Sequence, residues 1–173
     1  MKQYQDTIAL LPGLDLMPPQ WLHLTLQGIG FMDEISAADL AAVTRNVERR
    51  LSGLRPPAAT FHRPTIRPEA VILKADPPEP LYQLRVAVHD AIASVLDPAT
   101  FREPRPEPGR FTPHVSIAYV NSDGPAQPIA DSLASTDFQP VAVTFDSVSL
   151  LVFHRDRRMY EWTQAVPLPI GLG

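Results

Sequence analysis

Two short segments of the chain share one order of residue types: a histidine, an apolar residue, a hydroxyl residue and a second apolar residue. The copies are His23-Leu-Thr25-Leu and His114-Val-Ser116-Ile. Because residues i and i+2 of a β-strand share a face, each copy would present one imidazole and one hydroxyl to the same side. If the copies lie on neighbouring strands, both imidazoles and both hydroxyls converge on one groove.

This set of side chains suits in-line displacement at phosphorus. One neutral histidine can take a proton from the attacking oxygen, while the other, protonated, gives a proton to the leaving oxygen. The hydroxyls of Thr25 and Ser116 would hold the non-bridging oxygens and orient the phosphate. Since side chains supply both proton transfers and the charge stabilisation, we expect no metal and no cofactor. The near-symmetry of the motifs leaves open which of His23 and His114 is the acid and which is the base.

Both motifs are predicted to lie on strands. Leucines alternate with other residues across 21–27, and glycines end that run, which is the pattern of a half-buried strand. Residues 115–120 form the second strand. Regular alternation there would put Ala118 on the same face as His114 and Ser116, and would turn Tyr119 to the opposite face.

Apolar residues at helical spacing predict two helices elsewhere in the chain. The first begins after a Ser36 N-cap, and the second begins after Asp76-Pro-Pro and stops at Asp97-Pro98. Further strands are predicted at 7–11, 58–63, 70–75, 141–153 and 159–166, and a short helix at 128–135. Each half of the chain runs from a histidine strand through a helix to strands, which indicates a duplicated α+β unit rather than two independent domains.

Composition limits the function classes. The chain has 173 residues, 20 prolines and no cysteine, which excludes a disulfide scaffold, a thiol nucleophile, a zinc ribbon and an iron–sulfur site. A net charge of −4 argues against a grip on long nucleic acid, yet allows a small phosphate ligand. No apolar run approaches the roughly 18 residues of a membrane span, and we expect no signal peptide. We expect a cytoplasmic monomer with no membrane partner.

The ordered pair of motifs resembles the 2H phosphoesterase superfamily, which includes the bacterial RNA 2′,3′-cyclic phosphodiesterases also called 2′-5′ RNA ligases. The resemblance rests on LHLTLQGIG at 22–30, on FTPHVSIAY at 111–119, and on the segment between them, with PLYQLRVAVHDAIASVL at 80–96. It implies one bilobal α+β domain over residues 1–173, with pseudo-twofold duplicated antiparallel sheets, helices on the outside and a central groove. It also implies that His23 and His114 are catalytic and that Thr25 and Ser116 bind phosphate.

The resemblance implies a hydrolase of RNA processing that acts on a cyclic phosphate or a 2′-5′ linkage. Ligase-like relatives often carry an arginine shortly after the second motif, whereas Tyr119 and Val120 follow Ala118 here. This departure and the acidic charge balance point to a nucleotide cyclic phosphate or a short RNA end as the partner. A binding module with the same fold and no turnover is the alternative, and a structural partner protein is a weaker one.

Other side chains could contribute to such a site. Trp21 and Phe111 flank the motifs, and together with Tyr119 they are candidates for stacking on a base or contacting substrate. Four basic residues could supply positive charge to a phosphate, although solvation at the surface is the more common fate. They are Lys74, Arg63, Arg67 and Arg110. The basic run at 155–158 is interpreted as solvated charge, and His62, His89 and His154 as structural, although His62 could still approach the groove.

Overall fold

The computed structural model describes residues 1–101, 103–156 and 158–171. Arg157 of the basic run lies outside the described residues. In that described part the helices are α1 (Lys2–Ile8), α2 (Ala37–Ser52), α3 (Glu79–Ala93) and α4 (Gln127–Ser135), with 3-10 turns at Pro19–Trp21 and Pro98–Thr100. The strands are β1 (Leu14–Leu16), β2 (Ala58–Phe61), β3 (Thr65–Ile66), β4 (Ala70–Asp76), β5 (His114–Val120), β6 (Val141–Thr144), β7 (Ser147–Leu151) and β8 (Ala165–Pro169).

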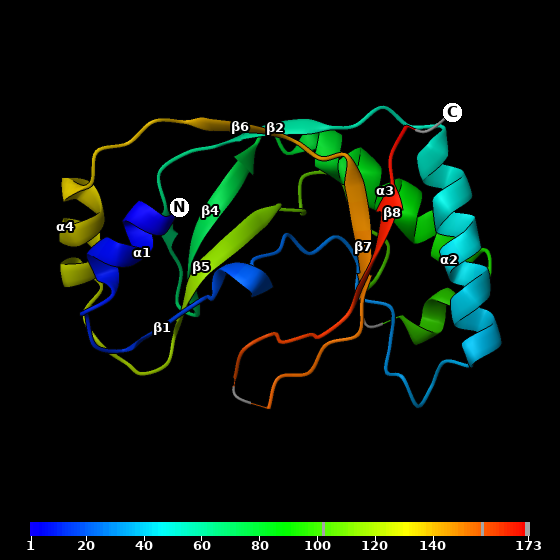
Figure 1. Ribbon diagram of the computed structural model, residues 1–173, viewed down its shortest axis with the longest axis horizontal. Helices are drawn as coiled ribbons and strands as arrows, with labels where there is room; N and C mark the ends of the chain where they lie inside the picture. The colour runs from blue at the N-terminus through cyan, green and yellow to red at the C-terminus, as the bar shows by residue number, and fades with distance from the viewer. Residues whose placement is uncertain (102, 157, 172–173) are drawn as a thin grey trace.

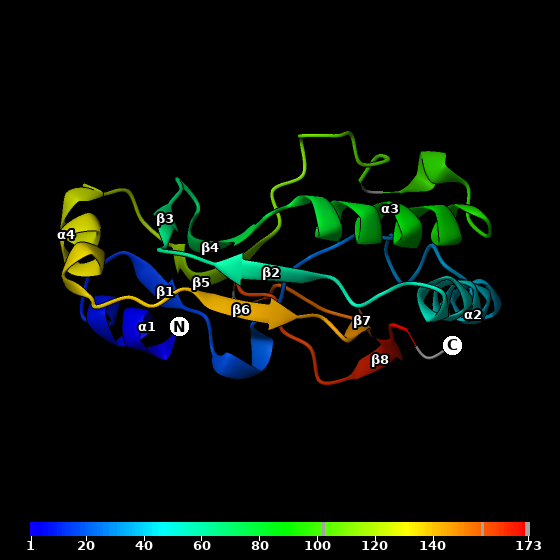
Figure 2. The same cartoon turned by 90° about the horizontal axis from the view of Figure 1, so that it is seen from above.

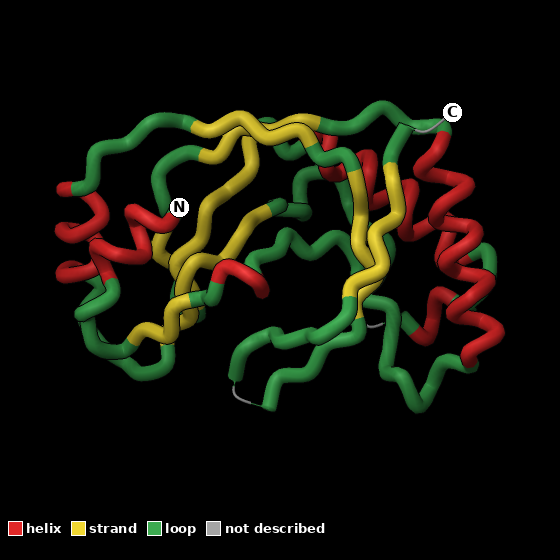
Figure 3. The backbone as a smooth tube through the Cα atoms, in the orientation of Figure 1, coloured by secondary structure: helices red, strands yellow, loops and turns green. Residues whose placement is uncertain are grey.

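The strands pair in two antiparallel groups. The larger has the order β1-β5-β4-β2-β6, with β3 also paired to β4, and β7 pairs with β8 in a separate ribbon. The tube in Figure 3 shows β7 and β8 running together into a long connection that extends from their far ends. Strands β4 and β5, from distant parts of the sequence, lie in the middle of the larger group.

Two hydrophobic clusters divide the molecule into lobes. One cluster joins α2, α3 and β8, and the other joins α1 and α4 to β4 and β5. Figure 2 shows α1 and α4 at one end of the molecule and α2 and α3 at the other. Strand β4 belongs to both lobes, because Val71 and Leu73 lie in the α1–α4 cluster while Ala75 lies in the α2–α3 cluster. The predicted bilobal α+β fold with outer helices is therefore confirmed (Figure 1).

The two predicted helices form where the apolar spacing places them. The Ser36 hydroxyl accepts a hydrogen bond from the Asp39 backbone N–H at 3.1 Å, which satisfies one free donor of the first turn of α2. Val43, Val47 and Leu51 then follow at helical spacing and are buried. The second helix, α3, ends at Ala93, four residues before the predicted stop at Asp97.

Two predicted strands near the N-terminus are wrong or reduced. Residues 7–11 were expected to be extended, but α1 covers Lys2–Ile8, because Tyr4 and Ile8 lie one turn apart and are both buried. Of the predicted strand 21–27, only Leu24 pairs, as an isolated bridge. The 3-10 turn through Trp21 takes the beginning of this segment out of the ladder.

The C-terminal strands also differ from the prediction. The expected long strand at 141–153 is divided into β6 and β7, because the chain turns at Phe145 and Asp146. The closing strand begins at Ala165 rather than at 159. Residues between β7 and β8 instead form the long connection, in which His154 and Glu161 make an isolated bridge.

A β-bulge in β5 changes which side chains share a face. Val71 of β4 pairs with Ala118, but the next residue, Ile72, pairs with Ser116, so Ile117 is an extra residue in β5. Ile117 and Ala118 are both completely buried in the α1–α4 cluster. The expected placement of Ala118 beside Ser116 is therefore wrong, because a bulge shifts the alternation by one residue.

The side chain of Gln5 stabilises this bulge. Its Nε2 donates to the backbone carbonyls of Ile117 at 2.9 Å and of Met17 at 2.6 Å. The Ile117 carbonyl also accepts from the Met17 N–H at 3.0 Å. Gln5 is buried, with only 7% of its surface exposed. Its amide nitrogen nevertheless has hydrogen-bond partners, and the backbone carbonyls at the bulge have donors.

Candidate functional site

The two histidine motifs lie side by side. Leu24 and Val115, the residues that follow the histidines, form an antiparallel bridge. Extending this register by one residue in each direction sets each histidine opposite the hydroxyl residue of the other motif. Opposite residues of an antiparallel pair have Cα atoms about 4.5–5.5 Å apart and project to one face. This register would bring together the side chains of His23, Thr25, His114 and Ser116.

The apolar residues of the motifs anchor this arrangement. Leu24 and Leu26 pack against the α2–α3 cluster, and Ile117 is part of the α1–α4 cluster. The first motif is thus fixed to one lobe and the second to the other. We call the side of the sheet that carries His114 and Ser116 the motif face.

Both imidazoles make the same backbone contact. Nδ1 of His23 lies 2.8 Å from the Trp21 carbonyl oxygen, and Nδ1 of His114 lies 2.8 Å from the Thr112 carbonyl oxygen. A carbonyl only accepts hydrogen bonds, so each Nδ1 carries a proton in these contacts. Each Nε2 is then the nitrogen available to take up or release a proton.

Aromatic residues from the β7–β8 connection pack against His23. The rings of Tyr160 and Trp162 meet the His23 ring edge-on, with centroids 5.4 Å and 5.3 Å away. The Trp21 indole Nε1 donates to the Trp162 carbonyl at 3.3 Å, so the predicted site residue Trp21 also ties this connection to the first motif. Figure 1 shows the connection, coloured orange to red, reaching from β7 and β8 towards the other lobe.

The β-bulge turns Tyr119 to the motif face, where the sequence did not place it. The Tyr119 phenol is close enough to the Ser116 side chain for that hydroxyl to affect its pKa. Burial raises the pKa of the Tyr119 phenol, and the nearby Tyr160 adds to the rise, while Arg155 and the Ser116 hydroxyl oppose it. The phenol therefore stays protonated at neutral pH and can donate a hydrogen bond.

Two basic residues lie close to the motifs. Lys74 of β4 pairs directly with His114 of β5, so its side chain shares the motif face. The Arg155 guanidinium lies over the Tyr160 ring, 4.4 Å from its centroid. Neither cation has an ion-pair partner among the described residues.

The other predicted candidates have different surroundings. Phe111 packs against the α2–α3 cluster and carries the Arg85 guanidinium 4.7 Å from its ring centroid. Arg110 pairs with Glu107 at 2.9 Å. His62 is exposed, with Nε2 3.7 Å from an oxygen of Asp76.

Sequence reasoning did not find the contacts of Tyr160 with His23 and with Arg155. Arg155 was interpreted as solvated charge, and no motif marks Tyr160. Both reach the motifs only through the fold of the β7–β8 connection, so spacing along the chain carried no signal for them.

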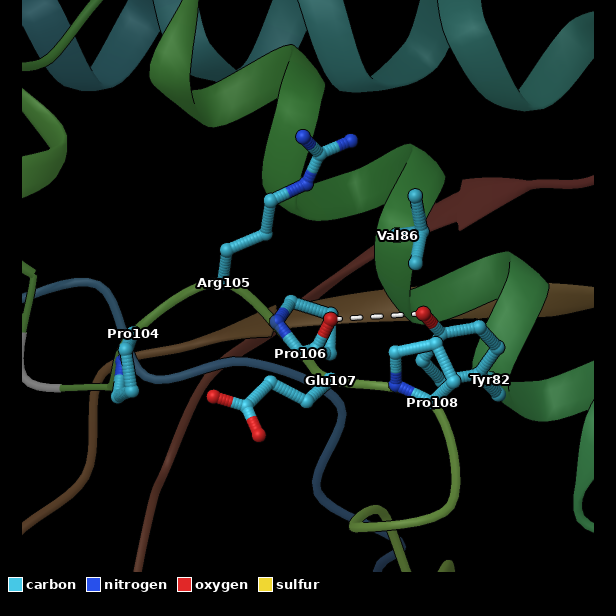
Figure 4. A pocket seen from close by; sticks show the side chains of 7 residues that line it. All are labelled: Tyr82, Val86, Pro104, Arg105, Pro106, Glu107 and Pro108. Atoms are coloured by element: carbon cyan, nitrogen blue, oxygen red, sulfur yellow. Dashed lines mark hydrogen bonds between the residues drawn. The ribbon is translucent and has the colours of Figure 1, made fainter.

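The pocket in Figure 4 is formed by residues outside the motifs. It is lined by Tyr82 and Val86 of α3 and by residues 104–108, and the Tyr82 hydroxyl donates to the Pro106 carbonyl at 3.4 Å. None of the four motif side chains lines it. Within the described ranges, no group of three or more metal-binding side chains gathers in one place. None of the helices described is both long and apolar enough to cross a membrane.

Comparisons with known proteins show the family and the fold of this chain. A family model described as the 2′-5′ RNA ligase superfamily matches residues 5–157. A search of the curated proteins found no match. The crystal structure of TT0787 of Thermus thermophilus has a similar fold, with a TM-score of 0.64 and 19% identity over 96% of this chain and 88% of that chain. Because the family model matches most of the sequence, this chain belongs to the 2′-5′ RNA ligase superfamily, which is the 2H phosphoesterase family that its motifs resemble.

Proposed function

We propose that this protein is a metal-independent phosphodiesterase acting on a 2′,3′-cyclic phosphate, or a related cyclic or 2′-5′ linkage, at a nucleotide or RNA end. The observation that carries the proposal is the bridge between Leu24 and Val115, which joins the two motifs. Family membership supports phosphoesterase or ligase-like chemistry in general.

The proposed roles of the side chains follow from the atoms that are available to contact a substrate. One Nε2, unprotonated, accepts the proton of the attacking water, and the other, protonated, donates to the leaving oxygen of the sugar. Thr25 and Ser116 hydroxyls donate to the non-bridging oxygens, where negative charge accumulates. The carbonyl contacts of His23 and His114 keep both rings in the orientation that leaves Nε2 free. His23 and His114 can exchange roles between cyclisation and hydrolysis, since the two reactions pass through one transition state.

The surroundings of the motifs favour an anionic ligand. Lys74 lies beside His114 without a carboxylate partner among the described residues, and the protonated Tyr119 phenol lies beside Ser116. A site with one cation and neutral hydrogen-bond donors around two imidazoles is better suited to a phosphate group than to a neutral ligand.

The proposal is tested by hydrolysis of the four nucleoside 2′,3′-cyclic phosphates and of 2′-5′ dinucleotides in EDTA, followed by ³¹P NMR. We expect turnover of at least one substrate, a single phosphomonoester isomer as product, and no change on chelation. Complete loss of activity in EDTA, restored by one divalent cation, would contradict the two-histidine mechanism. Tight binding without turnover would favour the nucleotide or RNA-end binding module instead.

A further inference from the structure

An arginine from outside the two motifs is linked to both of them through an aromatic ring. Arg155 belongs to the β7–β8 connection, and its guanidinium stacks on Tyr160 at 4.4 Å. The Tyr160 ring in turn lies 5.4 Å from the His23 ring and 6.4 Å from the Tyr119 ring. One aromatic ring therefore links the arginine to the first motif and to a tyrosine beside the second.

Stacking fixes where this guanidinium can act. A planar guanidinium over an aromatic ring keeps its N–H groups pointing outward around its edge, so they can still donate to an anion. Because Arg155 occupies one face of Tyr160, and Phe153 meets the same ring at 4.8 Å, Tyr160 is poorly placed to stack on a base. The packing of Tyr160 instead allows its ring to hold the Arg155 guanidinium in place.

Arg155 forms no ion pair with a carboxylate of the described residues. Asp156, its neighbour in sequence, pairs with His154 Nδ1 at 3.2 Å. Asp15, which is opposite Tyr119 on β1, accepts a hydrogen bond from the Asn121 amide at 2.7 Å. Arg155 is also close enough to Tyr119 to lower the pKa of the phenol, against the rise that burial causes. Its field therefore reaches the motif face, where no carboxylate of the described residues pairs with it.

We propose that Arg155, held on Tyr160, binds the reacting phosphate from the His23 side of the site. The inference rests on the proposed function, since it needs a phosphate at the histidine pair. Two parallel N–H groups of one guanidinium match two non-bridging oxygens in a planar fork, whereas a lysine ammonium acts as a point charge.

The test is binding of inorganic phosphate, followed through the Cε1–H NMR signals of His23 and His114. We expect Arg155→Gln to weaken phosphate binding by roughly tenfold or more, because a charge-assisted hydrogen bond is lost. Arg158→Gln makes the same charge change in the same connection, and should leave the affinity within about twofold. Thermal unfolding of both variants should match the parent, because Arg155 is exposed.

A double-mutant cycle tests whether Tyr160 holds Arg155 in its binding position. Tyr160→Phe keeps the ring and should retain phosphate affinity, whereas Tyr160→Leu should lose as much as Arg155→Gln. The double variant Tyr160→Leu/Arg155→Gln should bind phosphate no more weakly than either single variant. Fully additive losses would show that Arg155 acts independently of Tyr160 and would overturn that part of the inference.

The possible results separate this inference from the proposed function. If Arg155→Gln binds phosphate as well as the parent does, the inference is wrong and the two-histidine function stands. If phosphate moves neither histidine signal in the parent, the phosphate site itself is wrong, and the inference falls with it.

Discussion

Replacing His114 with asparagine separates the two nitrogens of the ring. The amide nitrogen of asparagine can occupy the place of Nδ1 and donate to the Thr112 carbonyl, now 2.8 Å from Nδ1. The substitution removes Nε2, the atom proposed to exchange the proton. One positioned proton-transfer group contributes about 10²–10⁴ in rate, or roughly 3–5 kcal/mol of barrier at ~1.4 kcal/mol per decade. We expect kcat/KM to fall by that factor.

The free energy of unfolding should change little in His114→Asn. His114 is exposed, and its backbone hydrogen bond is retained. His114→Ala also loses that bond, whose net value is about 0.5–1.5 kcal/mol, so only the alanine variant should be measurably less stable. The assay compares kcat/KM across pH on the best cyclic phosphate with urea unfolding of the same samples. His154→Asn, at an exposed histidine of the β7–β8 connection, is the matched control.

His23→Asn should lose a similar factor, and the double variant should lose less than the product of the two. Both groups act in one transition state, so their effects combine less than additively. The parent should give a bell-shaped pH–rate profile, and each single variant should lose one limb. Near-parent activity of either asparagine variant, with folding intact, would refute its role as acid or base.

Three more outcomes follow from the contacts around the motifs. Thr25→Val and Ser116→Ala should each weaken inorganic phosphate binding by roughly tenfold and lower kcat/KM. The shape of the pH–rate profile should stay the same, and a changed shape would show that the hydroxyls take part in proton transfer. Burial raises the pKa of Tyr119, so the ultraviolet titration difference between the parent and Tyr119→Phe should have its midpoint above about 10, and a midpoint below that value would contradict the burial. Because the folded state disfavours this phenolate, the contribution of Tyr119 to the free energy of unfolding is complete below about pH 10 and is lost as pH rises through the folded pKa. Gln5→Leu leaves the backbone carbonyls at the bulge with fewer donors and should cost about 1–3 kcal/mol in urea unfolding; an unchanged midpoint would mean that water replaces the amide.

Helix positions could be predicted because local patterns decide them. The Ser36 cap and the buried positions of α2 are all encoded within a few turns. The short helix α1 was missed because only Tyr4 and Ile8 mark its buried side, and the apolar run at 7–11 resembles a strand. Gln5 gave no signal, since its partners are backbone carbonyls from segments distant in sequence.

That the two motifs lie side by side could be predicted because the pattern occurs twice. Alternation places a histidine and a hydroxyl two residues apart on one face, and this holds as far as Ser116. Beyond Ser116 the alternation fails, because the register shift depends on β4 and on Gln5 rather than on β5 alone. Arg155 and Tyr160 could not be predicted, because only tertiary folding of the β7–β8 connection brings them to the motifs.

The extra residue in β5 affects how this sequence can be compared with its relatives. Because Ile117 and Ala118 both point into the core, Tyr119 reaches the motif face five positions after His114. In a relative whose strand has no bulge, the residue four positions after the histidine would face the same way. An alignment without a gap would therefore pair Tyr119 with a residue of the opposite face. Deleting Ile117 should leave the Tyr119 side chain on the motif face. Relatives can therefore differ in which side chain occupies this place without any change in the motif itself.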